Sequence, residues 1–169
     1  MTSTADVAPV PDTVDRVRQE WSEACPHLDT SPIDVVGRVH RISSICNHRL
    51  DVSLERHGIN RSEFTVLSAL VRAGRPLRAS EVVLTTMLSG ASITKIADAL
   101  VKRELVVRQK SERDGRVVLL APTDAGRAII DDQMPRRLAD EQRLIAGLTD
   151  DERQTLAGLL RKVCAALGD

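Results

Sequence analysis

The chain has 169 residues, of which 42 % are hydrophobic and 28 % are charged, and this size predicts one compact domain with room for a helical extension. Aromatic residues make up only 1 % of the chain, which excludes a stacking platform for single-stranded nucleic acid or RNA because such platforms need several exposed rings. The formal net charge is zero, so a nucleic-acid-binding role requires basic residues to be concentrated locally.

The N-terminal part predicts a flexible tail over residues 1–11 and two helices. Residues 12–24 form a short amphipathic pattern that ends before Pro26. Ser31 and Pro32 then suit the cap and the first position of a helix that runs to about His57 and ends at Gly58. Its apolar residues recur every three or four positions and form one stripe: Val35, Val39, Ile42, Cys46, Leu50 and Leu54.

The central part predicts three more helices followed by a β-hairpin. Asn60 and Glu63 resemble a capping pair for a helix over residues 61–73. A short helix is expected over 79–86, and Ser89 caps the next, over 90–103. The runs 105–110 and 116–120 are rich in β-branched residues and are joined by a turn that contains Asp114-Gly115. A helix followed by a hairpin is typical of a winged helix-turn-helix.

The C-terminal part predicts two helices. Thr123 begins the first, and Pro135 should kink it or start a new turn. Thr149 and Glu152 form a capping box for the last helix, which places an apolar stripe on one face: Leu156, Leu159, Leu160, Val163 and Leu167.

These elements predict a mainly α fold with a small β-hairpin wing, in the α+β class. We expect a DNA-binding domain over residues 58–122 and dimerisation helices over 12–57 and 123–169. The outer helices carry more apolar surface than the central domain can cover, and a second copy would bury it. A two-fold dimer would also place two recognition helices about one DNA turn apart, which matches a palindromic operator in double-stranded DNA.

The basic residues concentrate in the predicted DNA-binding segment. Residues 89–116 hold seven basic and four acidic side chains, whereas residues 124–169 hold seven basic and nine acidic ones. The candidate DNA contacts are Ser92, Thr94 and Lys95 on the helix, Arg113 and Arg116 at the hairpin tip, and Lys102, which with Arg103, Arg108 and Lys110 supplies a general positive field. The alternative is an ordinary solvated helix start and a solubilising turn.

A small-molecule site has weaker candidates. Trp21 either lines a ligand pocket or anchors the N-terminal helix, and Arg38 and Arg41 either meet an anionic ligand or form salt bridges. The histidines and the three cysteines show no metal-ligand or disulfide spacing, so neither a metal nor a cofactor is expected. No catalytic motif is present, and no transmembrane run or signal peptide is found; the simplest location is a reducing cytoplasm.

Several segments together resemble the MarR family of bacterial transcriptional regulators. The likeness covers about residues 31–168, and its marks are F-T-V-L-S-A-L-V-R-A-G from Phe64, M-L-S-G-A-S-I-T-K from Met87, R-D-G-R from Arg113 and T-D-A-G from Thr123. Trp21 and the segment S-P-I-D-V-V-G-R from Ser31 are similar to the HucR/PecS-like, urate-responsive branch, which carries an extra N-terminal helix.

The chain departs from that branch at two positions that help to hold urate there. Thr65 stands where the branch has an aspartate, and Ile96 stands where it has an arginine. At the wing, the family's D-R-R is Asp114-Gly115-Arg116, and Arg113 could replace the missing arginine. The resemblance therefore implies a ligand site that includes positions 21, 65 and 96 but differs from the urate site.

The leading hypothesis is a homodimeric regulator, most simply a repressor, that a small aromatic or anionic ligand releases from DNA, and not an enzyme. The alternative is a ligand-independent winged-helix protein that binds DNA in an architectural role. A third hypothesis is an enzyme or interaction module that reuses the fold, which would show no salt-dependent DNA binding.

Overall fold

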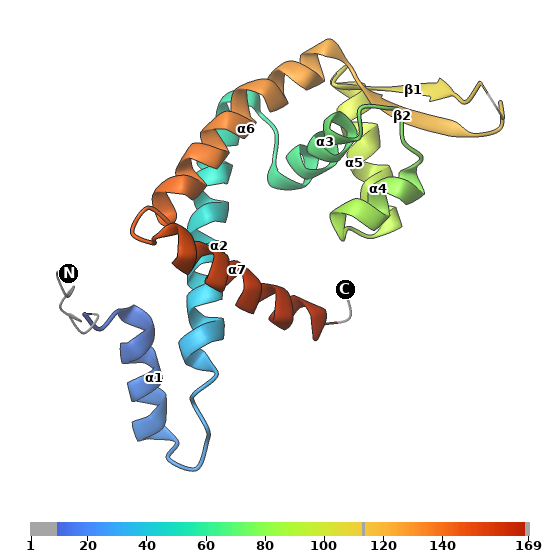
Figure 1. Cartoon of the computed structure of the whole chain (residues 1–169). Helices are drawn as coiled ribbons and strands as arrows, with labels where there is room; N and C mark the ends of the chain where they lie inside the picture. The colour runs from blue at the N-terminus through green and yellow to red at the C-terminus, as the bar shows by residue number, and fades with distance from the viewer. Residues whose placement is uncertain (1–9, 113, 168–169) are drawn as a thin grey trace. The chain divides into compact units, whose positions relative to one another are not determined.

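A computed structural model describes residues 10–112 and 114–167, and over them the chain is mainly helical with one two-stranded antiparallel hairpin (Figure 1). The predicted fold class is confirmed. The helical elements are α1 (Thr13–Ala24), α2 (Ile33–Leu54), the 3-10 turn η1 (Glu55–His57), α3 (Arg61–Ala73), α4 (Ala79–Thr86), α5 (Gly90–Lys102), α6 (Asp124–Leu144) and α7 (Asp150–Ala165). The chain divides into two compact units, one up to His48 and one from Arg49 onward.

Local capping chemistry sets most of the helix ends. Asn60 and Glu63 form a reciprocal capping box at α3, and Thr149 and Glu152 form another at α7, as predicted. Gly58 and Gly74 follow η1 and α3 with φ angles of 61° and 65°, a left-handed conformation that glycine adopts without steric cost. Helix α2 begins at Ile33, one residue after the predicted start, and its last turn tightens into η1.

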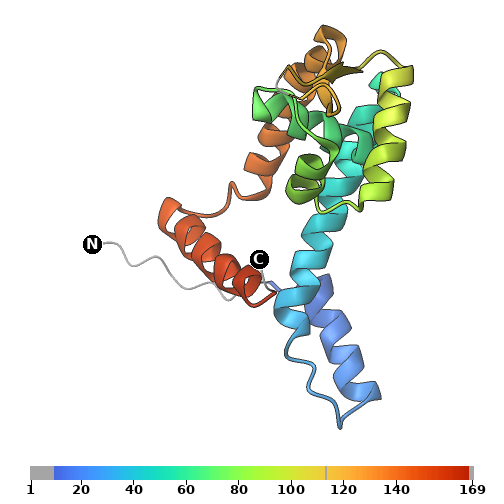
Figure 2. The same ribbon diagram turned by 90° about the vertical axis from the view of Figure 1, so that its right-hand side faces the viewer.

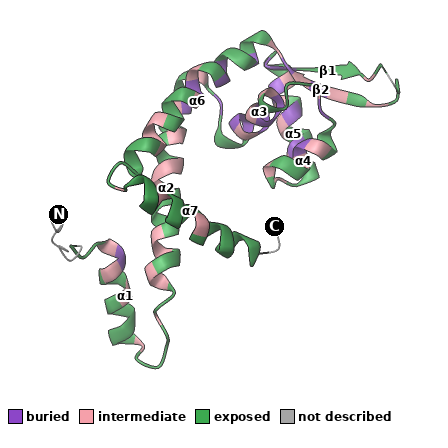
Figure 3. Cartoon of the chain, in the orientation of Figure 1, coloured by how far each residue is buried: buried purple, intermediate pink, exposed green. Residues whose placement is uncertain are grey.

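The core of the second unit lies between α3, α4, α5, α6 and the hairpin. Phe64 and Leu67 of α3 are fully buried together with Ile93 and Leu100 of α5, and the buried residues concentrate on these helices (Figure 3). A Cβ atom at Gly126 of α6 would lie 2.2 Å from the backbone carbonyl oxygen of Leu105, so only glycine fits this contact.

Helices α4 and α5 are in contact and lie side by side in both views (Figure 1 and Figure 2). Together they form the helix-turn-helix, and α3 packs against both of them. Strands β1 (Val106–Lys110) and β2 (Val118–Pro122) pair with Val106 opposite Pro122 and Lys110 opposite Val118. Leu77 forms a bridge to Leu120 through two backbone hydrogen bonds of 2.8 and 2.9 Å, which fixes the hairpin to the start of α4.

The second strand begins at Val118, two residues later than predicted. The amide of Arg116 donates to Asp114 Oδ1 at 3.0 Å and the amide of Val117 donates to the Asp114 carbonyl at 2.9 Å. These bonds hold the amides of Arg116 and Val117 in the turn, while the carbonyl of Val117 accepts from the amide of Ser111 at 2.9 Å, next to the end of the first strand.

Helix α6 continues through Pro135 from Asp124 to Leu144, so the predicted alternative of a new helical start at this residue is wrong. Proline has no amide hydrogen, which leaves the carbonyl of Asp131 without the donor that an unbroken helix supplies four residues later. Packing of Ile129, Ile130 and the buried Gln133 on the preceding turns holds the helix despite that loss.

The compact second unit extends beyond the predicted DNA-binding segment 58–122, because Leu54 and Ile130 join its core. The division into dimerisation and DNA-binding segments stays a prediction. None of the helices within residues 10–112 and 114–167 is long and apolar enough to cross a membrane.

Candidate nucleic-acid interface

Helix α5 is an amphipathic helix with a well-capped N-terminus. Ser89 Oγ accepts from the amide of Ser92 at 3.2 Å, and Ile93, Ala97 and Leu100 bury the opposite face in the core. The first turn holds no acidic residue, so its unpaired amides and positive dipole end remain favourable to a phosphate group.

The three predicted recognition residues occupy different positions on this helix. Thr94 and Lys95 are exposed, whereas Ser92 is half-buried. The Ser92 hydroxyl lies 2.9 Å from the Ser89 hydroxyl, and Thr94 Oγ1 donates to the carbonyl of Gly90 at 3.1 Å. Thr94 is therefore exposed with its hydroxyl hydrogen bonded to the helix backbone, and no ion pair of the exposed Lys95 is found within residues 10–112 and 114–167.

The C-terminal part of α5 is bound to the rest of the domain through arginines. Arg108 of β1 forms an ion pair with Asp98, which neutralises the carboxylate on the outer face of the helix. Arg103, the C-cap residue, donates to the carbonyls of Gly58 and His57 at 2.8 and 2.9 Å. The guanidinium groups of these two arginines help to position α5, and their contribution to a general positive field stays a prediction.

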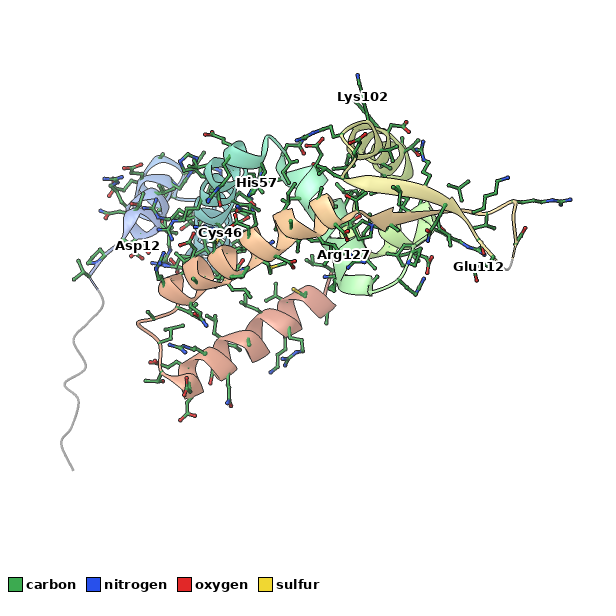
Figure 4. The ribbon with its side chains drawn as sticks, turned by 90° about the horizontal axis from the view of Figure 1, so that it is seen from above. Asp12, Cys46, His57, Lys102, Glu112 and Arg127 are labelled. Atoms are coloured by element: carbon green, nitrogen blue, oxygen red, sulfur yellow. The ribbon has the colours of Figure 1, made fainter. Side chains whose placement is uncertain are left out.

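Lys102 points outward from the last turn of α5 (Figure 4). Lys102 lies at the far end of α5 from Thr94 and Lys95, where its charge adds to the positive field. At the hairpin tip, Glu112 and Arg116 are exposed within the loop 111–117. Arg113, the second predicted wing contact, lies outside the described residues.

Arg38, one of the predicted ligand residues in the first unit, already forms hydrogen bonds within the protein. Arg38 donates to Asp12 Oδ2 at 3.0 Å, to Asp15 Oδ1 at 2.7 Å and to the carbonyl of Asp34 at 2.8 Å. The hydrogen bond from Arg38 is the largest cause that holds the pKa of Asp15 below its ordinary value. Arg38 thus joins the capping box of α1 to α2, whereas Arg41 and Trp21 are exposed.

The other two predicted ligand residues lie in the second unit. Thr65 is half-buried on α3, and its hydroxyl donates to the carbonyl of Arg61 at 2.8 Å. Ile96 is half-buried on α5 and packs against the hydrophobic core. Neither side chain carries a charge, so these two positions offer a ligand apolar contact and one hydroxyl group.

A polar network that sequence reasoning missed connects η1 to α6. His57 Nε2 lies 3.1 Å from Asp132 Oδ2 and 2.8 Å from Gln133 Nε2, and Ser53 Oγ donates to Gln133 Oε1. Gln133 is 1 % exposed, and its amide is satisfied by Ser53 at Oε1 and by Asp132 Oδ2, which accepts from Nε2 at 2.9 Å. Hydrogen bonds, first from Arg136 and then from His57, lower the pKa of Asp132. The partners are 75 to 80 residues apart, and no local pattern marks them.

No group of three or more possible metal ligands occurs among the described residues, and the three cysteines are free thiols. A capped helix with an exposed, acid-free first turn, packed beside a basic hairpin, defines the chain as a winged helix-turn-helix protein.

The comparisons with known proteins agree with this class. The sequence model of the MarR family matches residues 57–117. The regulator PecS of Dickeya dadantii is 28 % identical over 89 % of this chain and 92 % of its own, and the regulator MhqR of Bacillus subtilis is 31 % identical over 76 % and 86 %. The chain belongs to the MarR family, and its relatives are transcriptional regulators rather than enzymes.

Among solved structures, BpsR of Bordetella bronchiseptica superposes with a TM-score of 0.65 at 25 % identity. The superposition covers 77 % of this chain and 92 % of that one, and 6-hydroxynicotinic acid regulates DNA binding by BpsR. The match to PecS is consistent with the resemblance to the HucR/PecS-like branch.

Proposed function

We propose that this MarR-family regulator is a homodimeric repressor that binds a palindromic operator and leaves it when a small aromatic or anionic effector binds. The observation that carries the DNA-binding part is the first half of α5, where Thr94 and Lys95 stand exposed on a capped helix with no acidic residue in its first turn. The first turn would enter the major groove, and Arg116 would contact the adjacent backbone or minor groove.

The proposed contact set also includes Ser92, Arg113 and Lys102. Ser92 would act through its capping bond to Ser89 and so orient the first turn. Lys102 would contribute long-range attraction, since it lies three turns from the N-terminus of α5. Asp98 does not oppose the phosphates, because its carboxylate is paired with Arg108.

The homodimer is supported by apolar side chains on α2 and α7 that are exposed to solvent in the single chain. On α2, Val35, Val39 and Ile42 are exposed, and on α7 so are Leu156, Leu159 and Val163. Each set recurs at helical spacing and forms a stripe, and Figure 3 shows α7 almost wholly exposed. Contiguous apolar stripes of this kind mark association surfaces in soluble proteins.

The effector class is supported by Trp21 and Arg41, which are both exposed in the first unit. In the second unit, Thr65 and Ile96 are separate candidate contacts. An indole ring and a guanidinium group suit an aromatic acid. The regulation of BpsR by 6-hydroxynicotinic acid is a precedent for that chemistry in this fold. Arg38 is a poor candidate, because its nitrogens are occupied by Asp12, Asp15 and Asp34.

Release requires that the effector bind more tightly to a conformation in which the two recognition helices no longer fit successive major grooves. The affinity difference between the two conformations sets how far the population moves. An effector with equal affinity for both conformations would leave DNA binding unchanged.

The test is binding of the purified full chain to the DNA upstream of its own gene across a salt series, with and without urate and 6-hydroxynicotinic acid. Tight binding with a steep salt dependence, relieved by one compound, supports the proposal. Tight binding that neither compound relieves, with Trp21 fluorescence unchanged by both, favours the ligand-independent alternative. Absence of salt-dependent binding to any duplex would overturn the DNA-binding role.

A further inference from the structure

Two large apolar side chains stand out on the helix-turn-helix because they are almost completely exposed. Met87 is 91 % exposed and Leu84 is 84 % exposed, whereas their neighbours Val83 and Leu88 pack against the core. Leu84 lies in the last turn of α4, and Met87 is its C-cap residue, two positions before the N-cap Ser89 of α5. The exposed pair therefore borders the N-terminus of the recognition helix.

The backbone at Met87 is also unusual. Its φ angle is 57°, in the left-handed region that costs an L-residue roughly 1–2 kcal/mol and that glycine adopts freely. A flexible, apolar side chain is thus held outward at a turn where glycine would be less strained. Strain of this kind is a reason to look for a function at the residue.

The surrounding surface is poor in charge. From Leu84 to Ala97 the only charged side chain is that of Lys95, although 28 % of the whole chain is charged. On the first two turns of α5 the exposed side chains are those of Ala91, Thr94 and Lys95, and the first two carry methyl groups. The apolar side chains of this surface suit contact with base edges, whereas Lys95 and the N-terminal amides of α5 are the groups that suit phosphates.

We propose that Met87 reads the C5-methyl group of a thymine in the major groove, with Leu84 beside it. Among base-pair edges in the major groove only thymine presents a methyl group, and apolar side chains recognise it by contact. A protein partner fits less well, because two side chains bury only a small fraction of the roughly 800 Å² that each side of a stable interface buries. This inference rests on the proposed DNA-binding function and adds the class of base that the turn selects.

The experiment uses the full chain and duplex DNA selected by the protein from a random pool. Each thymine is replaced in turn by uracil, which removes only the methyl group, and affinity is measured by fluorescence anisotropy. At the position that Met87 contacts, the wild-type protein should lose affinity about fourfold, the factor expected for one buried methyl group. Met87→Gly should bind the thymine duplex more weakly and should show no further loss with uracil.

Glu104→Gly is the matched control. Glu104 is the other described non-glycine residue with a positive φ, 58°, and it lies in the turn after α5. Its replacement relieves the same kind of strain without removing an apolar group, so the uracil effect should remain about fourfold. Because Met87→Gly relieves strain, it should fold at least as well as the wild type, which thermal unfolding checks.

The outcomes separate this inference from the function on which it rests. The thymine contact is overturned, and DNA binding stands, if the protein binds duplexes with a steep salt dependence but no uracil substitution lowers its affinity. The same conclusion follows if uracil lowers the affinity of the wild type and of Met87→Gly equally. If the protein selects no duplex at all, the proposed function fails and the contact fails with it.

Discussion

Lys95 is the residue on which the proposed interface depends most directly. It is exposed on the second turn of α5, where an ammonium group can reach a phosphate or a base edge. We expect Lys95→Ala to weaken DNA binding and to lower the slope of log affinity against log salt by about one unit. Lys162→Ala, which removes an equal charge from α7, is the control and should leave the slope unchanged; equal effects of both changes would remove Lys95 from the interface.

The backbone conformation of Glu104 lowers the stability of the fold, and within residues 10–112 and 114–167 no hydrogen bond or ion pair of its side chain is found. Its φ of 58° is unfavourable for an L-residue, and its side chain is exposed. Glu104→Gly should therefore raise the free energy of unfolding by about 1 kcal/mol, less the entropy that glycine adds to the unfolded chain. Chemical denaturation measures the change. Glu104→Ala keeps the strain and removes the charge, so a gain of equal size in that variant would contradict the backbone explanation.

At the scale of an element, ion pairs with Arg38 stabilise the N-terminus of helix α1. Arg38 of α2 holds Asp12 and Asp15, the two residues of the α1 capping box. The hydrogen bond from Arg38 lowers the pKa of Asp15 in the folded protein. The ion pair therefore stabilises α1 fully at a pH above the unfolded aspartate pKa of about 3.9, and this contribution is lost as the pH falls through the lower folded value.

Trp21 makes this acid dependence measurable, because it is the one tryptophan of the chain and lies on α1. We expect its emission to be constant from neutral pH down to about 4 and to shift below that value. In the Asp15→Asn variant, the Trp21 emission at neutral pH should already resemble that of the wild type at acid pH. The change in emission on acidification should be smaller than in the wild type. A step of unchanged size in this variant would show that another carboxyl group controls α1.

The hairpin is the second element whose contribution can be isolated. Arg116 is exposed in the loop 111–117, and its backbone amide is fixed by Asp114. Arg116→Ala should lower DNA affinity and reduce the salt slope by about one unit for each phosphate contact that it removes. Arg127→Ala on α6 provides the matched loss of charge outside the wing. A normal slope in Arg116→Ala would mean that the wing does not touch the DNA backbone.

The sequence predicted those parts of the fold that depend on neighbours along the chain. The caps at Asn60 and Thr149 follow from a glutamate three positions later, and the cap at Ser89 follows from its own residue type; all three are confirmed. The start of strand β2 was predicted two residues too early. The side chain of Asp114 competes with the opposite strand for backbone amides, and the sequence does not show which of the two hydrogen-bond patterns forms.

Contacts over long sequence distances could not be predicted in the same way. Arg103 donates to the carbonyls of His57 and Gly58 across 45 or more residues, a contact that the sequence did not indicate. Gln133 lies in a helix whose sequence shows little segregation of apolar and polar faces, so its complete burial beside His57 had no local signal. The orientation of such side chains depends on helix packing, which periodicity alone does not determine.

At the scale of the whole molecule, the recognition helix is connected to other elements at both ends. Asp98 ties α5 to the wing through Arg108, and Arg103 ties the C-terminus of α5 to η1. The side chain of His57 in η1 is in turn held by Asp132 and Gln133 of α6. These hydrogen bonds connect α6 to α5 through η1, and the proposed effector release would need a physical connection of this kind only if the effector displaced α6.

The proposed dimer depends on apolar surface that α7 leaves open to solvent. Leu156, Leu159 and Val163 are between 41 and 54 % exposed and lie within about two turns on one side of the helix. A carboxylate placed among them would be buried without a partner if a second copy covered this stripe, and such burial costs several kcal/mol. Leu156→Glu should therefore convert a dimer into a monomer in sedimentation equilibrium.

The same change should weaken binding to a two-site operator far more than binding to a single half-site, because a dimer gains affinity from engaging both half-sites at once. Gln154→Glu is the control, since it adds the same charge to the same helix on the side away from Leu156. A Leu156→Glu variant that remains dimeric would show that α7 is not in the interface and would leave the exposed stripe of α2 to form it. Monomeric wild-type protein with full operator affinity would contradict the homodimer itself, because a single recognition helix cannot contact two half-sites.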